Sequence, residues 1–343
     1  MARLGEPNQP RMARLESGRR SGASLLSHPL RRLPLGVRGQ AVARTYVAQP
    51  ALWGQPPRSC EQCPAAGGAQ YSLRRRWPGA MIDDMREIEV VVAHSERVTL
   101  RVGDVFLKID TDQSRIDREV EVMARAPIPT PEVLWRKPPV LALAAVPGAA
   151  LGVLDEPSRA SSAAWVAAGA AVRTLHDAPL PPWPSSQCQQ QPALSSRGTV
   201  EFPPGLDSEC EWLVANDVVS ADVVRRNRQV AEAALRPWTP VFIHGDLQIV
   251  HVFVDGDEVS GVVDWSEGGQ GDAMYDLATL TLAHEEHLDD VVAGYGGDIE
   301  IDVIRAYWSL RSLMEIRWLV EHGYGAPATF PEVAVLNSLS ASS

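Results

Sequence analysis

The chain has 343 residues, 45% of them apolar, so it can bury a large core and is long enough for two domains. No apolar run approaches the roughly 20 residues that a membrane-spanning helix needs, so we expect no membrane association. The net charge of −11 is unevenly distributed, because residues 1–80 hold 13 Arg and three Glu and the rest of the chain is strongly acidic. An acidic body argues against a general nucleic-acid-binding protein, since phosphate backbones need cations. An acidic body is compatible with a cationic small-molecule partner.

The N-terminal stretch does not have the pattern of a folded domain. Residues 1–80 are rich in Arg, Pro, Gly and Ser and have few periodic apolar positions, so we expect a disordered extension. A transit peptide has a similar composition, and a biological start at Met81 is the simpler alternative. Cys60 and Cys63 form a single C-x-x-C pair without the further ligands of a zinc site. The cysteine usage fits a reducing, cytoplasmic location.

The pattern changes at Met81, and residues 81–147 predict a small β-rich lobe. Short β-rich runs alternate with polar turns, and one stretch has apolar residues at helical spacing before a series of prolines. We expect strands over 88–92, 98–102 and 105–109, a helix over 111–126, and strands over 133–135 and 140–146. Pro147 and Gly148 then form a candidate hinge.

The second lobe, residues 148–325, is predicted to be mainly helical. Apolar stripes and helix-ending signals indicate helices ending near Asp177 and over 209–235, 274–283, 285–295 and 301–322. Residues 181–207 predict a long loop, and residues 326–343 a flexible tail. Trp308, Trp318 and Tyr307 are expected in the core. The run from His284 to His287 is expected on a solvated helix face, with an acidic acceptor site as the alternative.

One hairpin is embedded among these helices and carries two exposed acids. An apolar run leads into His244-Gly245-Asp246, and the hairpin that follows ends at Asp264. Acids at the ends of strands joined by a tight hairpin are expected to converge. Phosphoryl transfer needs one carboxylate to orient a hydroxyl group and another to hold a metal ion. The alternative for each acid alone is a turn-capping role.

Lys108 stands in an otherwise apolar strand, and Glu119 follows eleven residues later in the predicted helix. A strand lysine paired with a helix glutamate is how kinases hold the α- and β-phosphates of ATP. A lysine in such a strand can also reach solvent at a sheet edge.

The motifs together resemble a known family. His244-Gly245-Asp246, His251 and Asp264-Trp265 resemble the catalytic and metal-binding loops of the aminoglycoside phosphotransferase family. Residues 271–278 resemble its Gly-Asp-Pro-x-x-Asp-Leu-Ala segment, and residues 170–176 resemble the helix end ahead of its catalytic loop. The resemblance covers roughly residues 85–322. It implies an α+β, protein-kinase-like bilobal fold, with a β-rich N-lobe at 81–147 and a helical C-lobe at 148–325.

The resemblance also implies roles for individual residues. Asp246 is expected to be the catalytic carboxylate, Asp264 to chelate Mg²⁺, and Lys108, held by Glu119, to bind the phosphates of ATP. The loop from His94 to Arg97, with Ser95, is expected to cover the phosphates although it lacks a glycine-rich signature. Backbone groups of Ala144 to Val146 are expected at the adenine. His244, Asp272 and Asp276 are expected to support the catalytic loop. The implied function is ATP-dependent phosphorylation of a hydroxyl group on an aminoglycoside-like molecule, an amino alcohol or another metabolite.

One position departs from the family pattern. The family has Asn five residues after the catalytic Asp, and this chain has His251. The amide of Asn offers a hard oxygen to Mg²⁺, whereas imidazole offers a nitrogen that Mg²⁺ takes poorly. Either His251 alters the second metal position or it hydrogen-bonds the catalytic loop. A kinase-like protein that binds nucleotide or another ligand without catalysis is therefore the alternative function.

A third hypothesis is a metal oxygenase that uses His244, Asp246 and a further His. The β-barrel expected for it is absent from the predicted elements. The acceptor and the oligomeric state are not determined by the sequence.

Overall fold

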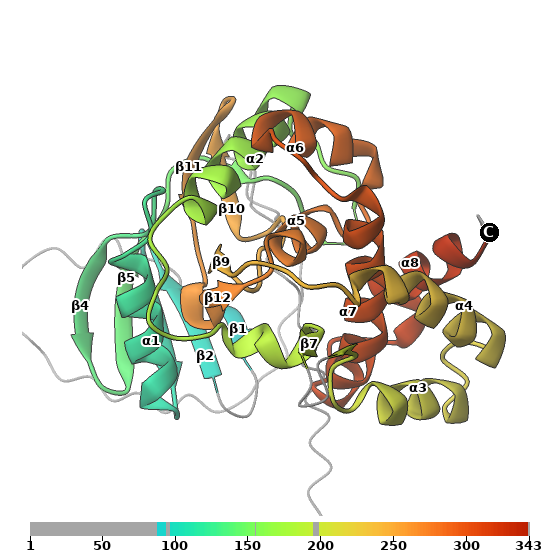
Figure 1. Ribbon diagram of the computed structural model, residues 1–343. Coiled ribbons are helices and arrows are strands. Elements are labelled where there is room, and N and C mark those ends of the chain that lie inside the picture. The colour runs from blue at the N-terminus through green and yellow to red at the C-terminus, as the bar shows by residue number, and fades with distance from the viewer. Residues whose placement is uncertain (1–87, 94–96, 155, 195–198, 342–343) are drawn as a thin grey trace, which may run out of the picture. The chain divides into compact units, whose positions relative to one another are not determined.

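The computed structural model describes residues 88–93, 97–154, 156–194 and 199–341 (Figure 1). All of them belong to a single compact unit. The expectations for residues 1–80, for the C-x-x-C pair and for Ser95 lie outside the described residues. Within the described part of the chain, no helix is long and apolar enough to cross a membrane.

The N-lobe is built on a five-stranded antiparallel sheet with the strand order β1-β2-β3-β5-β4. Its strands are β1 (Ile88–Ala93), β2 (Arg97–Val102), β3 (Val105–Asp110), β4 (Val133–Lys137) and β5 (Val140–Ala144). The register pairs Lys108 with Thr99 on one side and with Leu141 on the other, so Lys108 lies inside the sheet rather than at its edge. The five strands predicted from the sequence are confirmed.

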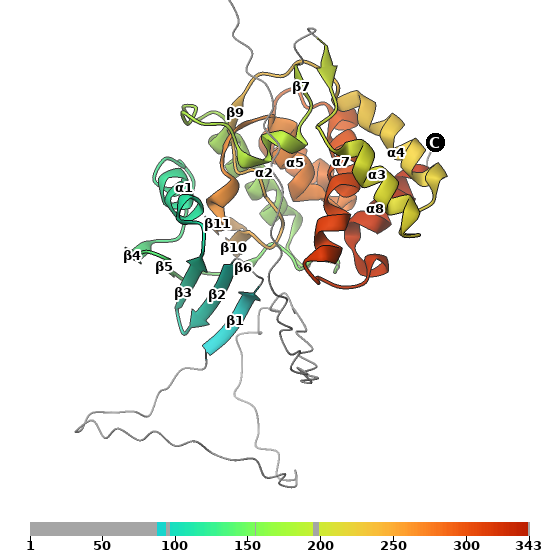
Figure 2. The same ribbon diagram turned by 90° about the horizontal axis from the view of Figure 1, so that it is seen from below.

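Helix α1 (Gln113–Met123) connects β3 to β4 and packs beside the sheet (Figure 2). It begins where the side chain of Asp112 accepts a hydrogen bond from the amide of Ser114, the usual way to satisfy a free helix N-terminus. Its apolar face buries Ile116, Val122 and Met123. The same face carries the buried Glu119, so the packing that fixes the helix also fixes this carboxylate.

The C-lobe contains the predicted hairpin and two short strand pairs. Strands β10 (Val252–Asp255) and β11 (Glu258–Val262) form the hairpin, and β6 (Ala149–Ala150) pairs with the outer side of β10. Strand β9 (Val241–Ile243) pairs with β12 (Gly269–Gly271). Gly148 has φ +85°, and a Cβ there would lie 2.1 Å from the carbonyl oxygen of Val254, so the connection between the lobes requires glycine.

Helices surround these strands (Figure 1). They are α2 (Ser162–His176), α3 (Leu206–Ala215), α4 (Ala221–Ala231), α5 (Ala273–Thr281), α6 (Leu288–Tyr295), α7 (Ile301–Glu321) and α8 (Pro331–Ala341). Short 3-10 helices are η1 (Ser186–Gln190), η2 (Glu232–Ala234), η3 (Trp265–Glu267), η4 (Glu285–His287) and η5 (Pro327–Thr329). The largest buried side chains of the core are Trp165, Trp265, Tyr275 and Tyr307. Helix α7 contacts α3, α4, α5 and α8 and is the central support of this lobe.

The C-lobe differs from the sequence predictions in several places. The single helix expected over 209–235 is two helices, because the chain turns at Asp217 with φ +54° and restarts at Ser220, which caps α4. The loop predicted over 181–207 contains η1 and the short pair β7 (Ala193–Leu194) and β8 (Val200–Glu201).

Two predictions about burial in the C-lobe are wrong. Trp318, expected in the core, is 41% exposed because the last turns of α7 extend past the core. His284, expected on a solvated face, is only 4% exposed and packs beside Trp165.

The C-terminal segment also differs from its prediction. Residues 326–343 were expected to form a flexible tail, but residues 331–341 form α8, which packs on α4 and α7. Val333 and Leu336 are buried at helical spacing, and Asn227 donates to the carbonyl oxygen of Leu336 at 2.8 Å. The apolar stripe of this segment fills a surface that α4 and α7 present, which sequence reading alone did not reveal.

Candidate functional site

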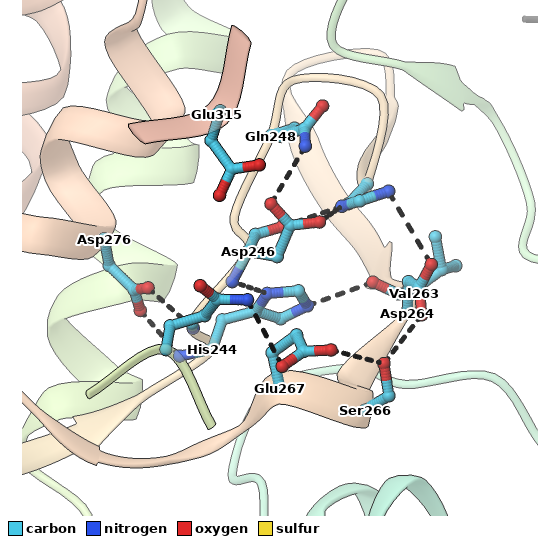
Figure 3. A network of polar contacts seen from close by, with 12 residues as sticks. His244, Asp246, Gln248, Val263, Asp264, Ser266, Glu267, Asp276 and Glu315 are labelled. Atoms are coloured by element: carbon cyan, nitrogen blue, oxygen red, sulfur yellow. Dashed lines mark hydrogen bonds and ion pairs between the residues drawn. The ribbon is translucent and has the colours of Figure 1, made fainter. Parts of the chain in front are cut away.

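The loop after β9 is held in a conformation that only glycine allows. Gly245 has φ +87°, and a Cβ would lie 2.6 Å from the carbonyl oxygen of Glu267 and 2.7 Å from the hydroxyl of Ser185. The buried carboxylate of Asp276, in the first turn of α5, accepts the amides of His244 at 2.7 Å and of Gly245 at 2.9 Å (Figure 3). The carboxylate of Asp276 therefore fixes the backbone just before Asp246.

The two oxygens of Asp246 have different surroundings. Oδ1 accepts hydrogen bonds from Nη2 of Arg311 at 3.0 Å and from Nε2 of Gln248 at 2.9 Å. Oδ2 lies 3.8 Å from Nδ1 of His251. Burial alone would raise the pKa of Asp246, but the charges of Arg311 and His251 outweigh it and hold the pKa below its ordinary value. Asp246 is therefore a carboxylate at neutral pH, and its two side-chain hydrogen bonds are both on Oδ1 rather than Oδ2.

Arg311 is a member of the site that the sequence reasoning missed. It lies on α7 and is 7% exposed, and its Nη1 donates to the hydroxyl of Tyr275 at 3.2 Å. Oε1 of Glu315, one helical turn later, lies 4.0 Å from Nη1 of Arg311. Figure 3 shows the carboxylate of Glu315 on the side of Asp246. A signal existed in the sequence: Arg311 follows Tyr307 by four residues and so shares its helix face, where a charged side chain needs a partner.

The second carboxylate, Asp264, lies two residues after β11 and has a left-handed backbone conformation with φ +63°. Asp tolerates this region better than most residues, and such conformations concentrate at functional sites. Its Oδ1 accepts a hydrogen bond from Nζ of Lys108 at 2.9 Å and lies 3.6 Å from Nη1 of Arg97. Burial would raise the pKa of Asp264, but Lys108 and Arg97 hold it far below its ordinary value.

Lys108 and Glu119 form the pair expected from their positions. Nζ of Lys108 donates to Oε1 of Glu119 at 2.5 Å, and both side chains are buried. Burial would lower the pKa of Lys108, but Asp264 and Glu119 raise it, so the lysine is charged. One cation from the N-lobe thus bridges its own helix and the acid at the end of the C-lobe hairpin.

His251 lies between the two site carboxylates. Its Nδ1 is 2.7 Å from the backbone carbonyl oxygen of Asp246, so Nδ1 is the donor, while Nε2 lies 3.9 Å from Oδ2 of Asp264. Of the two alternatives that the sequence left open, a hydrogen bond to the catalytic loop is therefore present. This bond ties the hairpin to the loop and leaves a nitrogen, rather than the hard oxygen of Asn, on the side of Asp264.

The residues present fit a divalent cation at one position. Asp264 offers the carboxylate oxygens that Mg²⁺ prefers, and His251 offers only nitrogen. The described residues contain no cluster of three or more His, Cys, Asp or Glu side chains that would hold a metal ion by themselves. A cation at Asp264 would therefore need further oxygen ligands from a bound nucleotide and from water.

Two further supports were predicted, and they lie at different distances from the acids. His244 accepts the amide of Asp246 at Nδ1 and donates from Nε2 to the carbonyl oxygen of Val263 at 3.0 Å, so it connects the two acid-bearing segments. Burial lowers the pKa of His244 and keeps it neutral. Asp272 caps α5 and accepts the hydroxyl of Tyr307 at 2.9 Å, so it braces the helix that carries Asp276.

The segment proposed to meet adenine has one donor already in use. The amide of Ala144 donates to the carbonyl oxygen of Glu132 at 2.9 Å, so an adenine contact at Ala144 would have to use its carbonyl oxygen. Val146 lies against Gly261, where a Cβ would be 2.5 Å from Cγ1 of Val146. The role of this segment stays a prediction.

Comparison with known proteins is consistent with this arrangement. The chain resembles viomycin phosphotransferase from Streptomyces vinaceus, with 32% identity over 177 residues that cover 47% of this chain and 56% of that protein. The match thus spans little more than half the length of this curated relative.

Three solved structures have a similar fold. A choline/ethanolamine kinase family protein from Mesorhizobium loti has a TM-score of 0.52 and 18% identity, and the match covers 75% of this chain and 89% of that one. The GDP complex of aminoglycoside 2′-phosphotransferase-IIIa has a TM-score of 0.55 and 14% identity, and the match covers 76% of this chain and 94% of that one. Spectinomycin phosphotransferase in complex with ADP and spectinomycin has a TM-score of 0.53 and 12% identity, and the match covers 75% of this chain and 94% of that one. At these identities the likeness concerns the fold, which confirms the predicted kinase-like α+β architecture.

The family assignment rests on the sequence model described as "phosphotransferase enzyme family", which matches residues 93–311. That range includes Lys108, Asp246, Asp264 and Arg311. The chain therefore belongs to the phosphotransferase enzyme family.

Proposed function

We propose that this protein transfers the γ-phosphoryl group of ATP to a hydroxyl group of a small molecule. The observation that carries the proposal is the convergence of Asp246 and Asp264 on the imidazole of His251. Nδ1 of His251 lies 3.8 Å from Asp246 and Nε2 lies 3.9 Å from Asp264. Asp264 is bound to a buried lysine, whereas Arg311 and Gln248 hold Asp246 through Oδ1 and leave Oδ2 with only the longer contact to His251. This is the division of roles that phosphoryl transfer requires.

The nucleotide is proposed to bind on the side of Lys108 and Asp264. Lys108 would donate to the phosphates of ATP while Glu119 keeps its ammonium group in place. Asp264 would hold Mg²⁺, which neutralises charge on the phosphates when it is bound. Because ATP is also abundant in the cytoplasm, this donor fits the location that the cysteine usage predicts.

The acceptor is proposed to bind beside Asp246. Its hydroxyl would donate a hydrogen bond to Oδ2 while Arg311 and Gln248 hold Oδ1, so that one lone pair of the acceptor oxygen is directed toward the phosphorus. A loose transition state needs this orientation more than it needs a strong base, which agrees with a carboxylate whose pKa is lowered. As the new O–P bond forms, the bond between the γ-phosphorus and the bridging oxygen of ATP breaks and ADP leaves. The acceptor proton passes to Oδ2 of Asp246 and from there to solvent.

The acceptor class follows from charge and from the relatives. Glu315 lies beside Asp246 in Figure 3, so a cationic acceptor would find two acidic side chains there. We therefore propose an aminoglycoside-like molecule, an amino alcohol or another hydroxylated cation. The relative named for viomycin supports an antibiotic among the candidates.

The test is direct detection of phosphoryl transfer. The protein with Mg-ATP or Mg-GTP is incubated with a panel of amino sugars, cyclic peptide antibiotics, amino alcohols and macrolides, and phosphorylated products are identified by mass spectrometry. Product that depends on both the protein and Asp246 supports the proposal. No product with any acceptor, from protein that is folded and binds nucleotide, contradicts it.

A second function is favoured by a specific observation. His251 bonds the catalytic loop where the family pattern has Asn, so nucleotide binding without turnover is the alternative. Calorimetry with Mg-ATP separates the two functions: binding without transfer supports the alternative, and turnover excludes it.

A further inference from the structure

Arg97 is a second cation on the acid that is proposed to hold the metal ion. It begins β2, its side chain is 16% exposed, and its Nη1 lies 3.6 Å from the same Oδ1 of Asp264 that accepts the hydrogen bond from Lys108. Two positive side chains of the N-lobe therefore share one carboxylate oxygen of the C-lobe. Neither the two-acid motif nor the Lys108–Glu119 pair explains why a second cation lies beside Asp264.

The shortest contact of the Arg97 guanidinium is made by its Nε. Its Nε donates to Oδ2 of Asp110 at 3.1 Å, and Asp110 is 2% exposed. The other oxygen of Asp110 accepts the amide of Asp112 at 2.7 Å, so this anchor is itself held. The two Nη groups of Arg97 point to Asp264 and to Ser266, whose hydroxyl is 3.4 Å from Nη2. A guanidinium that is anchored through Nε and makes only these longer contacts through its Nη groups is suited to binding phosphate oxygens.

The charges explain what the two Nη groups of Arg97 would bind. A divalent cation on Asp264 repels a guanidinium that lies within 4 Å of the same carboxylate. The repulsion is relieved if an anion arrives together with the cation, and the phosphates of a nucleotide are such an anion. Asp110 keeps Arg97 from turning away into solvent, so its Nη groups stay beside Lys108 and can pair with the incoming phosphates.

We propose that Arg97 binds the β- and γ-phosphates of the nucleotide next to Lys108, as a second phosphate-binding cation. The inference rests on the proposed function, because it concerns the same nucleotide site. Arg97 keeps its proton throughout, and its contribution is to offset negative charge on the transferring group. The alternative is that Arg97 only joins the lobes through its contacts with Asp264 and Ser266.

The experiment compares nucleotides that differ in phosphate number. Affinities for Mg-ATP and for AMP are measured by calorimetry or competition in wild-type protein, Arg97→Gln, Arg97→Lys and the control Arg101→Gln. Arg101 lies four residues further along the same strand, where its side chain contacts Glu89 and the ring of Phe106 instead of Asp264. Thermal unfolding of each variant shows whether it folds.

We expect Arg97→Gln to weaken ATP binding by about 10- to 100-fold, the loss of one or two charge-assisted hydrogen bonds, and to leave AMP binding nearly unchanged. Arg97→Lys should recover part of the loss, and Arg101→Gln should resemble wild type. If Arg97→Gln fails to fold, the smaller ATP-specific loss in Arg97→Lys carries the test.

Two outcomes overturn the inference. One is unchanged ATP affinity in folded Arg97→Gln or, where that variant does not fold, in Arg97→Lys. The other is an equal loss for ATP and AMP, which assigns Arg97 to joining the lobes. Binding is read without turnover, so ATP binding that depends on Arg97 in a protein that phosphorylates no acceptor contradicts the proposed function and leaves the inference standing. Wild-type protein that binds no nucleotide contradicts both.

Discussion

The two acids of the site are held in different ways. Asp246 takes its partners from its own lobe, since Arg311 lies on α7 and Gln248 on the same loop. Asp264 takes its partners from the other lobe, since Lys108 lies on β3 and Arg97 on β2. The orientation of Asp246 is therefore independent of the N-lobe, whereas that of Asp264 depends on how the N-lobe is placed.

This difference separates the two halves of the proposed reaction. The acceptor side is organised before any ligand arrives, because its bonds are internal to a packed helical lobe. The nucleotide side is held by ion pairs that ATP and a cation must rearrange. Substitutions on the two sides should therefore have different consequences for kcat, for ATP affinity and for stability.

The largest effect is expected from Asp246→Asn. Loss of the acceptor-orienting carboxylate should lower kcat by at least about 100-fold, while ATP affinity changes little because Asp246 has no N-lobe partner. Steady-state kinetics and ATP calorimetry measure the two quantities. Asp255→Asn, at the exposed turn of the hairpin, is the matched control. Wild-type kcat in Asp246→Asn would show that the acid has no role in the reaction.

Arg311→Met should affect the acceptor side through Asp246. Removing one partner of a buried pair costs about 3–5 kcal/mol of unfolding free energy, and kcat should fall with it. Denaturant unfolding and kinetics measure both effects. Arg317→Met, on the same helix but with an exposed pair to Glu321, is the control and should leave the melting temperature nearly unchanged.

The pH profile distinguishes this role from simple destabilisation. In wild type the pKa of Asp246 lies below its ordinary value, so its ionised form contributes stability above the unfolded pKa of about 3.9 that is lost as the pH falls through the folded pKa. Without Arg311, burial raises that pKa, so the acidic limb of kcat should move to higher pH. An unmoved limb in folded Arg311→Met would assign the arginine to packing alone.

Lys108→Met should affect the nucleotide side. ATP affinity is expected to fall by about 10- to 100-fold, because a charge-assisted hydrogen bond contributes about 1.5–3 kcal/mol. Stability should fall too, because Glu119 is left buried without its partner. In Lys108→Met/Glu119→Met we expect stability to recover and ATP affinity to stay low. Recovery of both would mean that Lys108 serves only to neutralise Glu119.

The smallest effect is expected at Trp183, where the lobes meet away from the acids. The guanidinium carbons of Arg118 in α1 and of Arg125, two residues after that helix, lie 4.4 and 5.2 Å from the centre of its ring. Nε1 of Trp183 donates to the carbonyl oxygen of Gly268. Each cation–π contact contributes about 0.5–1 kcal/mol, so Trp183→Leu should raise the KM for ATP a fewfold and leave kcat nearly unchanged. A larger effect on kcat than on KM would contradict the separation of the two sides.

Much of the fold was predictable because its signals are local. The alternating runs of the N-lobe, the hairpin and the apolar stripe of α2 were found by spacing alone, and the family motif joined them into a kinase-like fold. The break between α3 and α4 and the docking of α8 were missed. A turn at Asp217 and an apolar stripe in a short C-terminal helix acquire meaning only against the surfaces that receive them.

The amino-acid sequence by itself determined which chemical groups are present and their order: the lysine, the two acids, the glycine between His244 and Asp246, and His251 in place of Asn. Tertiary structure alone decided what each group contacts. Arg311 is 65 positions from Asp246, Lys108 is 156 positions from Asp264, and Arg97 reaches the same acid from another strand. Such partners depend on how helices and sheets pack, and packing is not encoded in the spacing of any one motif.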